Sequence, residues 1–174
     1  MDEVTLIEKN ILAEWNTQAI KTCFVVNNIT MKDCIKSNSP ECVKWLLNNS
    51  YDVHAENDYA LHWASSNGHL EVVKLLLNNG YDVHAHVQND GALRWASQRG
   101  HLEVVKLLLE AGADVHVEDD SALRYASQRG HLEVVKELLD AGADVHAKDD
   151  SALSLASMNG HLEVVELLKQ WKKR

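Results

Sequence analysis

Gly68-His69-Leu70-Glu71-Val72-Val73 is one of four copies of the same hexapeptide in this chain. The other copies begin at Gly100, Gly130 and Gly160, so successive copies are 32, 30 and 30 residues apart. Each copy follows the pattern Ala-Leu-x-x-Ala-Ser and precedes a pair of leucines. Self-similarity at a fixed period of this size is typical of a stacked array of small units, so we expect no single central core.

Each period predicts two short helices. Residues 60–65 form a first helix, and Gly68 ends it, because a left-handed residue after a helix costs least as glycine. A second helix begins at His69-Leu70-Glu71, where the acidic side chain suits the positive end of the helix dipole. Its apolar side is predicted to carry Leu70, Val73, Leu76 and Leu77. A polar link of the form Gly-x-Asp-Val-His leads to the next unit. Two such helices cannot bury their apolar sides alone, so neighbouring units must stack.

The beginning of the chain follows the repeat less closely. Residues 30–50 are a degenerate copy in which Ser39-Pro40-Glu41 replaces the His-Leu-Glu start. Proline is tolerated in the first turn of a helix, so this start is still a helix start. Residues 1–29 are predicted to form a helical cap, and residues 30–174 the repeat domain. Its complete repeats are expected at about 51–80, 81–112, 113–142 and 143–174.

Composition indicates a folded protein with ordinary solubility. The 174 residues are 45% apolar and 25% charged, and the net charge of −9 argues against bulk attraction to nucleic acid or anionic membrane. No run of 18 apolar residues predicts a membrane span, and Met1-Asp2-Glu3 is unlike a basic secretory signal. Cys23, Cys34 and Cys42 are irregularly spaced and odd in number, which suits a reducing compartment. We therefore expect an intracellular location, in the cytoplasm.

The repeated pattern resembles the ankyrin repeat. That family has Thr-Pro-Leu-His-x-Ala in its first helix, Gly-His-Leu-Glu-Val-Val-Lys-Leu-Leu-Leu in its second and Gly-Ala-Asp-Val-Asn-Ala in the link, and the likeness covers about residues 30–171. It implies an all-α ankyrin-repeat solenoid of stacked helix-turn-helix units. The mostly 30-residue period is shorter than the usual one of about 33. The missing residues lie at the hairpin loops, which are expected to shrink to tight turns. This short form resembles the ankyrin proteins of mimivirus-like giant DNA viruses.

The residue pattern gives no support for catalysis. Phosphate-binding, dinucleotide-binding and nucleophile-elbow motifs are absent from the sequence, and acids and histidines recur as copies instead of converging. A metal ladder of His69, His101, His131 and His161 is excluded by spacing, because neighbouring helices lie about 8–10 Å apart and a zinc–nitrogen bond measures about 2 Å. These histidines are expected to bond to local backbone. We predict no enzyme activity, cofactor, metal or small-molecule substrate.

A second series of histidines stands where the family has asparagine. The resemblance implies that this position is a substrate site for an asparagine-type hydroxylase in animal cells, whereas the alternative is a structural role in the hairpin. The four residues concerned are His54, His84, His116 and His146.

Ankyrin repeats usually bind proteins through hairpin tips and the inner side of first helices. Carried over to this chain, the resemblance implies two groups of partner-binding residues. The residues at the hairpin tips are Glu56, His86, Glu118 and Lys148. The residues along the first helices are Ser66, Asn67, Arg94, Gln98, Arg99, Arg124, Gln128, Arg129, Met158 and Asn159. The four arginines predict a central basic patch for an acidic protein, although neighbouring aspartates would also neutralise it. Trp63, Trp95 and Tyr125 share one position and either pack between repeats or form a stacking platform.

The predicted function is therefore a non-catalytic protein–protein interaction module of unidentified partner. The giant-virus resemblance would make that partner a host protein and the location the host cytoplasm. Two alternatives remain from the sequence: a structural or virion component, and a weak nucleic-acid binder that uses the arginine patch.

Overall fold

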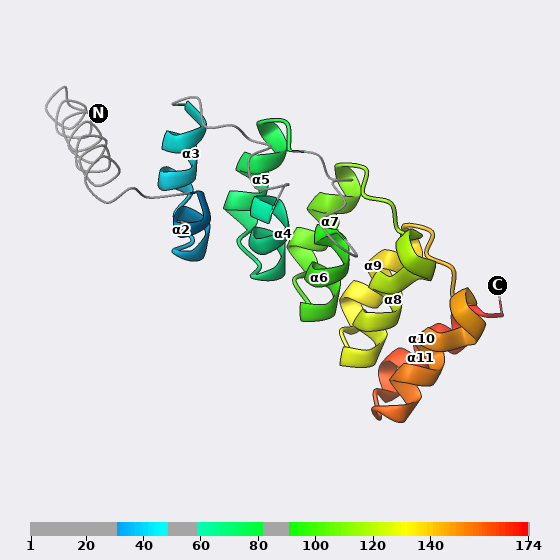
Figure 1. The fold of residues 1–174 in the computed structure, drawn as a ribbon. Helices are drawn as coiled ribbons and strands as arrows, with labels where there is room; N and C mark the ends of the chain where they lie inside the picture. The colour runs from blue at the N-terminus through cyan, green and yellow to red at the C-terminus, as the bar shows by residue number, and fades with distance from the viewer. Residues whose placement is uncertain (1–30, 49–58, 82–90, 174) are drawn as a thin grey trace, which may run out of the picture.

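The computed structural model describes residues 31–48, 59–81 and 91–173, and the predicted cap lies outside them. These residues form consecutive helix pairs (Figure 1). The pairs are α2 (Met31–Lys36) with α3 (Pro40–Asn48), α4 (Tyr59–Ser66) with α5 (Leu70–Asn78), α6 (Ala92–Arg99) with α7 (Leu102–Glu110), α8 (Val117–Arg129) with α9 (Leu132–Asp140), and α10 (Ala147–Met158) with α11 (Leu162–Trp171). No described helix is long and apolar enough to cross a membrane.

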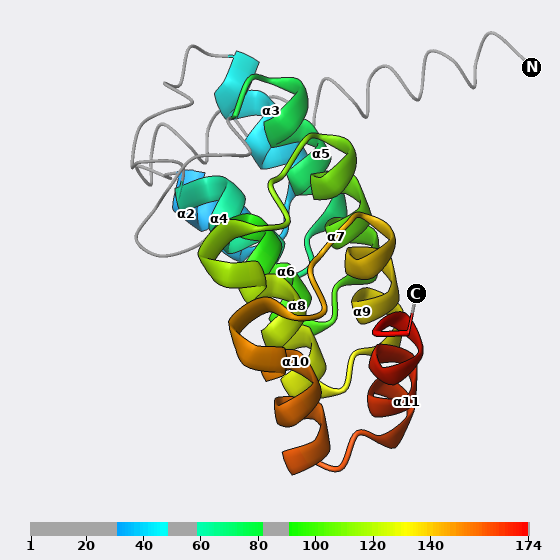
Figure 2. The same cartoon turned by 90° about the vertical axis from the view of Figure 1, so that its right-hand side faces the viewer.

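The pairs stack side by side into two layers. Figure 2 shows the first helices of the pairs, α2, α4, α6, α8 and α10, in one layer and the second helices, α3, α5, α7, α9 and α11, in the other. Each first helix packs against its partner and against the first helices of the neighbouring pairs. The predicted all-α solenoid is confirmed: the described helices form an open row in which each pair contacts its neighbours.

Glycine makes the sharp turn inside the pairs that follow α2 and α3. Gly100, at φ 76°, follows α6 in the left-handed conformation. Its N–H donates to the Ser97 carbonyl at 3.2 Å, and the following His101 N–H donates to the Ala96 carbonyl at 2.9 Å. These two bonds satisfy carbonyls that the end of the helix would leave without partners. The sequence prediction that glycine ends the first helix is confirmed.

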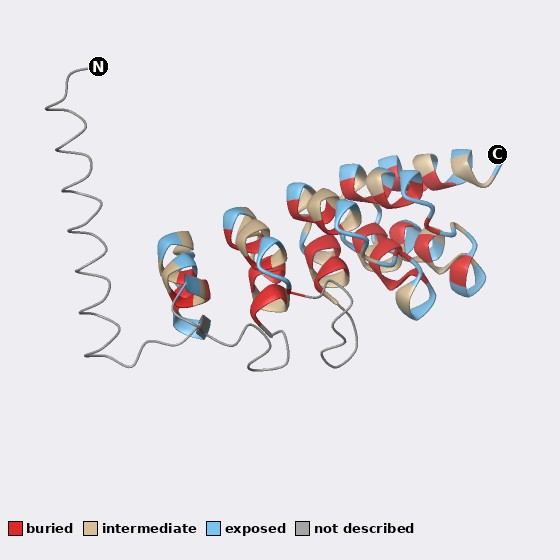
Figure 3. Ribbon diagram, turned by 90° about the horizontal axis from the view of Figure 1, so that it is seen from above, coloured by how far each residue is buried: buried red, intermediate tan, exposed pale blue. Residues whose placement is uncertain are grey.

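The core runs as a continuous strip between the two layers. Buried positions line the inward sides of the helices along the whole row (Figure 3). In α7 the fully buried side chains are Val104, Val105 and Leu108, and α5 and α9 bury the same positions. The predicted apolar side of the second helix is confirmed but incomplete. Val73 and Leu76 are buried, and Leu70 and Leu77 are partly buried and pack against the core. Val72, which the prediction left out, is also buried. The second helix contacts its own first helix and two neighbouring second helices, so it buries more than a single stripe.

The degenerate first pair keeps the same turn with different residues. Asn38 occupies the glycine position with a left-handed φ of 49°, which asparagine tolerates better than most residues. Pro40 begins α3, and the hydroxyl of Ser39 accepts the Cys42 N–H at 3.3 Å. The predicted helix start at Ser39-Pro40-Glu41 is therefore confirmed.

Left-handed turns replace the hairpin fingers at two of the tips. Glu118, Asp119 and Asp120 have φ values of 51°, 54° and 55°, and residues 148–150 repeat this conformation. The Asp120 N–H donates to the His116 carbonyl at 3.3 Å, which closes a single turn of left-handed helix. No β-strand occurs among the residues that the structure describes. The predicted shortening of the hairpin is thus confirmed, and its form is a tight left-handed turn.

Candidate functional site

The aspartate of the Gly-Ala-Asp-Val-His link fixes the chain before each described tip. The Asp114 carboxylate accepts the His116 N–H at 2.9 Å, and Asp144 accepts the His146 N–H at 2.8 Å. An aspartate that bonds to the backbone two residues ahead forms an Asx turn. This local bond holds the chain in place for the left-handed turn that follows.

Asp120 connects two successive repeats from inside the tip. Its side chain is almost fully buried, and Oδ1 accepts the backbone N–H of Asp144 in the next link at 2.8 Å. The same oxygen accepts Nδ1–H of His116 at 3.2 Å. A buried carboxylate is tolerated when several donors satisfy it. Asp120 is therefore part of the junction between repeats and is not available on the surface.

Arg124 is held by the tip of its own repeat. Its Nη2–H donates to the Glu118 carbonyl at 2.9 Å, and its Nε–H donates to the Asp119 carbonyl at 3.0 Å. Both carbonyls belong to residues with a left-handed backbone conformation, so they cannot accept the usual hydrogen bonds of a continuing right-handed helix. The guanidinium therefore supplies the hydrogen-bond donors that these two carbonyls need. It also lies near the ring of Tyr125, with Cζ 5.7 Å from the ring centroid.

Arg94 lies between aromatic rings of two repeats. Its Cζ is 4.7 Å from the centroid of the Trp95 ring and 5.3 Å from that of Tyr125. On the other side, the His62 ring meets Trp95 edge to face, with centroids 5.7 Å apart. The histidine, the arginine and the two aromatic side chains follow one another along the first-helix layer, and all of them are partly buried. Of the two interpretations of the aromatic series, this geometry favours packing between repeats.

Three glycine turns hold the histidine of the next repeat. The rings of His101, His131 and His161 lie against the glycine of the preceding repeat, and Nε2–H donates to a carbonyl there. The acceptors are Ser66, Gln98 and Gln128, at 3.2, 3.1 and 3.0 Å. A Cβ added at Gly100 would come within 2.6 Å of His131 Nδ1. The expected bond to local backbone was wrong, because the partner belongs to the neighbouring unit.

Burial controls the charge of several histidines. Burial lowers the pKa of His62, and the nearby Arg94 lowers it further. Burial likewise lowers the pKa of His69, with an additional contribution from His101. Burial also lowers the pKa of His101, against a raising effect of its bond to the Ser66 carbonyl. Protonation would place a charge in the repeat junction, so the neutral imidazole is the form that stabilises the stack.

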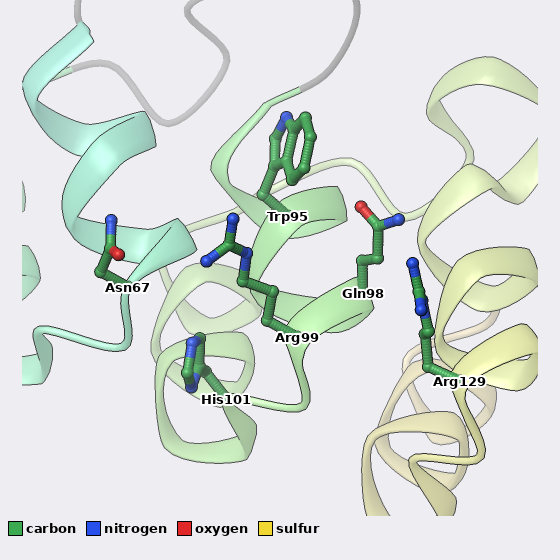
Figure 4. A pocket seen from close by; sticks show the side chains of 6 residues that line it. All are labelled: Asn67, Trp95, Gln98, Arg99, His101 and Arg129. Carbon is green, nitrogen blue, oxygen red and sulfur yellow. The ribbon is translucent and has the colours of Figure 1, made fainter.

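Two arginines remain exposed beside an open hollow of about 590 Å³ in the first-helix layer. Its lining is Asn67, Trp95, Gln98, Arg99, His101 and Arg129 (Figure 4). Arg99 and Arg129 end α6 and α8, where a cation interacts favourably with the negative end of the helix dipole. Figure 4 shows Arg99 on the side of Asn67 and Arg129 on the side of Gln98. The hollow combines two guanidinium groups, side-chain amides and an aromatic ring, which suits contact with carboxylates.

Comparison with protein families matches the ankyrin repeat model, "Ankyrin repeats (3 copies)", over residues 31–119 and 116–173. The two matches cover most of the chain. The chain belongs to the ankyrin repeat family. Ankyrin repeats generally mediate protein–protein interaction, and the family is generally non-catalytic.

The predicted partner-binding residues of this ankyrin protein divide into exposed and engaged groups. Arg99, Glu118, Arg129, Lys148, Met158 and Asn159 are exposed, and Asn67, Gln98 and Gln128 are partly buried. Ser66 is only 6% exposed, so its side chain does not contribute to the surface. The central basic patch is also reduced, because Arg94 and Arg124 are partly buried and bound as described above. Glu56, His86, His54 and His84 lie outside the described residues.

The described members of the proposed hydroxylation series have exposed rings. His116 donates from Nδ1 to the Asp120 carboxylate, and His146 donates from Nδ1 to Asp150 at 2.9 Å. These bonds give the two histidines a role in holding the tip. Hydroxylation itself stays a prediction.

Sequence reasoning missed the structural role of Asp120. The signal was present, because an Asp-Asp pair precedes Ser-Ala-Leu both at residues 119–120 and at residues 149–150.

In the described part of the chain, no group of three or more histidines, cysteines or acids comes together as a metal site. Cys34 is buried and Cys42 partly buried, both as free thiols, and burial raises the pKa of Cys34.

Proposed function

We propose that this ankyrin protein binds an acidic segment of a partner protein at the hollow formed by α4, α6 and α8. The carrying observation is that Arg99 and Arg129 are exposed there, whereas Arg94 and Arg124 are occupied within the fold. Two guanidinium groups at the same position of successive repeats present charge at a fixed spacing. An extended acidic chain lying across the first-helix layer would meet both.

The rigid stack favours such binding energetically. The guanidinium groups stand at the ends of helices that are packed on both sides, so little backbone ordering accompanies association. Charge–charge contacts at an open surface contribute mainly to orientation and association rate, so specificity requires further contacts. Trp95 and the tip residues Glu118 and Lys148 are suitably placed to supply them, because they belong to the same or adjacent repeats.

The partner class follows from the short repeat. The resemblance of the 30-residue form to giant-virus ankyrin proteins supports a host protein as the partner and the host cytoplasm as the place of contact. This origin belongs to the proposal. A role in nucleic-acid binding is less favoured, because two of the four arginines on which it depended are bound inside the fold.

The test uses the full chain with Arg99→Gln and Arg129→Gln together. Captured partners are identified from host lysate, and the affinity of the best partner is measured by titration calorimetry. Loss of two charge contacts is expected to weaken binding by about tenfold, which corresponds to about 1.4 kcal/mol. The dependence of the affinity on salt should decrease in parallel, because fewer ion pairs form.

A matched control removes the same charge from the other layer. Lys44→Gln with Lys136→Gln alters two exposed lysines on α3 and α9, away from the hollow. This control should bind as the unmodified chain does. Equal loss in both double variants would show a general charge effect, and full retention by the arginine variant would place the contact elsewhere. Binding to an oligonucleotide that strengthens as salt falls, and that the arginine variant loses, would favour nucleic acid instead.

A further inference from the structure

The first described helix pair, α2 with α3, carries a cysteine on each helix where the later pairs carry none. Cys34 stands four positions before the turn residue Asn38, and Cys42 stands four positions after it. In every later pair, the same two positions are an alanine and a valine, as Ala96 and Val104 flank Gly100. That alanine and that valine are both buried. Two equivalent core positions, one on each helix, are therefore replaced together in the first pair, and both by cysteine.

The turn between α2 and α3 holds the two cysteines close together. The Ser39 N–H donates to the Cys34 carbonyl at 3.1 Å, and the Ser39 hydroxyl accepts the Cys42 N–H at 3.3 Å. The Cys34 carbonyl also accepts the hydroxyl of Ser37 at 3.0 Å. Ser39 is thus bonded to the backbone of both cysteines. Their side chains meet inside the pair, where the two thiols are hydrogen-bonded to each other.

The two thiols differ in their access to solvent. Cys34 is only 1% exposed, whereas Cys42 packs against the edge of the core and is partly exposed. Burial raises the pKa of the Cys34 thiol, and the neighbouring Cys42 raises it further. An oxidant in solution therefore meets Cys42 first, and Cys34 is the thiol held behind it. An accessible cysteine beside a second cysteine is the arrangement of a reversible redox site.

We propose that Cys34 and Cys42 form a reversible intramolecular disulfide when the chain meets a low-molecular-weight disulfide such as oxidised glutathione. The Cys42 thiolate attacks one sulfur of that disulfide, whose S–S bond breaks and releases one small thiolate. Cys34 then loses its proton and attacks the Cys42 sulfur, so the mixed disulfide breaks and releases the second small thiolate. The released thiolates take up the two protons that the cysteines lose, and two electrons pass from the protein to the small disulfide.

The disulfide ties α2 to α3 by a covalent link. α2 has six residues and is the shortest helix in the described part of the chain. A helix this short depends on its packing more than on its own hydrogen bonds, so in the reduced chain it opens locally at low cost. A cross-link that closes the loop 34–42 restrains that opening. The site is separate from the proposed partner contact, because no residue of α2 or α3 lines the hollow beside Arg99 and Arg129.

Tryptic mapping of the full chain locates the disulfide directly. Cleavage at lysines leaves the three cysteines on separate peptides, 22–32, 33–36 and 37–44. The folded chain is equilibrated with oxidised and reduced glutathione, the remaining thiols are alkylated, and the peptides are identified by mass. The product that joins 33–36 to 37–44 is expected to exceed any disulfide of 22–32 by at least about tenfold, because thiols already in contact have a high effective concentration. Excess dithiothreitol should reverse it.

The same reaction in concentrated urea separates the fold from the sequence as the cause of pairing. Cys23 and Cys42 lie at similar distances along the chain from Cys34, so loop closure alone favours neither partner strongly. The preference for the product that joins 33–36 to 37–44 should therefore fall sharply when the chain is unfolded. A main product that contains peptide 22–32 in the folded chain, glutathione adducts without an internal disulfide, or the same preference in urea would overturn the proposal.

The later repeats supply matched variants that assign the two roles. Cys34→Ala and Cys42→Val each introduce the residue that every later pair has at that position, so circular dichroism should show an unchanged fold. Cys34→Ala should leave Cys42 as a glutathione adduct, because no second thiol resolves it. Cys42→Val should leave the buried Cys34 unmodified, and Cys23→Ser should form the disulfide as the unmodified chain does. A glutathione adduct on Cys34 in Cys42→Val would contradict the order of attack.

Hydrogen exchange tests the effect on the helix pair. Oxidation is expected to slow exchange of the α2 amides by at least about tenfold, because the link restrains local opening. The double variant Cys34→Ala with Cys42→Val should exchange at the same rate with and without oxidised glutathione. Equal rates for the reduced and oxidised forms of the unmodified chain would show that the disulfide does not hold α2 to α3.

Discussion

The contact between Gly100 and His131 makes a quantitative prediction about Gly100→Ala. An alanine at φ 76° carries the left-handed penalty of about 1–2 kcal/mol. Its Cβ would also lie 2.6 Å from His131 Nδ1, so the ring must move away. The ring then loses its 3.1 Å bond to the Gln98 carbonyl, which contributes about 1 kcal/mol net. The expected total loss of unfolding free energy is about 2–3 kcal/mol.

Gly160→Ala is the matched control for this substitution. Gly160 has a φ of 75° and stands at the same position of its repeat, but nothing lies within 4 Å of its added Cβ. Only the left-handed penalty of about 1–2 kcal/mol applies there. Urea unfolding followed by circular dichroism measures both variants under the same conditions. The difference between them isolates the contact with the histidine.

A double-mutant cycle then assigns the cause. His131→Ala removes the ring, so adding Gly100→Ala to that variant should cost only the backbone penalty. The coupling free energy between the two sites is expected to be about 1 kcal/mol. Equal losses for Gly100→Ala and Gly160→Ala, together with additive effects in the cycle, would refute the idea that these glycines make room for the next histidine.

Four other predictions follow from the same structure. The lowered pKa values of His62, His69 and His101 mean that the unfolded chain binds more protons below pH 6.5, so the urea midpoint should be constant above that pH and fall below it, and His101→Gln should reduce the fall. Glu118→Asn should raise the unfolding free energy by about 0.5–1 kcal/mol, because asparagine tolerates the left-handed region better, and a loss in thermal denaturation would contradict this. The buried Ser97 hydroxyl has no hydrogen-bond partner, so Ser97→Ala should be neutral or stabilising by up to about 1 kcal/mol in urea unfolding. Asp120→Ala should cost about 1–3 kcal/mol by the same assay, because the Asp144 N–H loses its acceptor, and an unchanged midpoint would exclude that junction.

The helical part of the fold was predictable because its determinants are local. Two of these determinants lie within one repeat: the glycine at the end of a first helix and the acidic residue in the first turn of a second helix. The 30-residue period can likewise be read directly from the sequence. The sequence also showed that the hairpin was short. Its conformation was not predictable, because residues such as Glu118 and Lys148 rarely adopt a left-handed φ. At residues 118–120, Arg124 of the following helix bonds to two carbonyls of the turn, and the Asp120 side chain bonds to the next repeat.

The candidate site was predictable only in part, because a repeat shows equivalence and not contact. The histidines at the starts of second helices are equivalent in sequence, but their bonds cross to the preceding repeat. The four arginines likewise looked like one patch. Arg94 lies between two rings and Arg124 binds carbonyls, whereas Arg99 and Arg129 remain exposed. Only the contacts in the structure, within a repeat for Arg124 and across repeats for Arg94, separate the structural pair from the exposed pair.

The position of the exposed arginines would let the proposed binding surface form without loss of stability. An exposed cation interacts favourably with the last turn of a helix by about 0.3–1 kcal/mol, and Arg99 and Arg129 both end helices. The neutral Asn67 and Asn159 occupy the same position in other repeats, where the amide of each bonds to a carbonyl of the preceding turn at 2.8 Å. Both residue types therefore satisfy the helix end, and the choice between them changes the charge of the hollow without disturbing the junctions. Substitutions at this position should consequently alter affinity far more than they alter the free energy of unfolding.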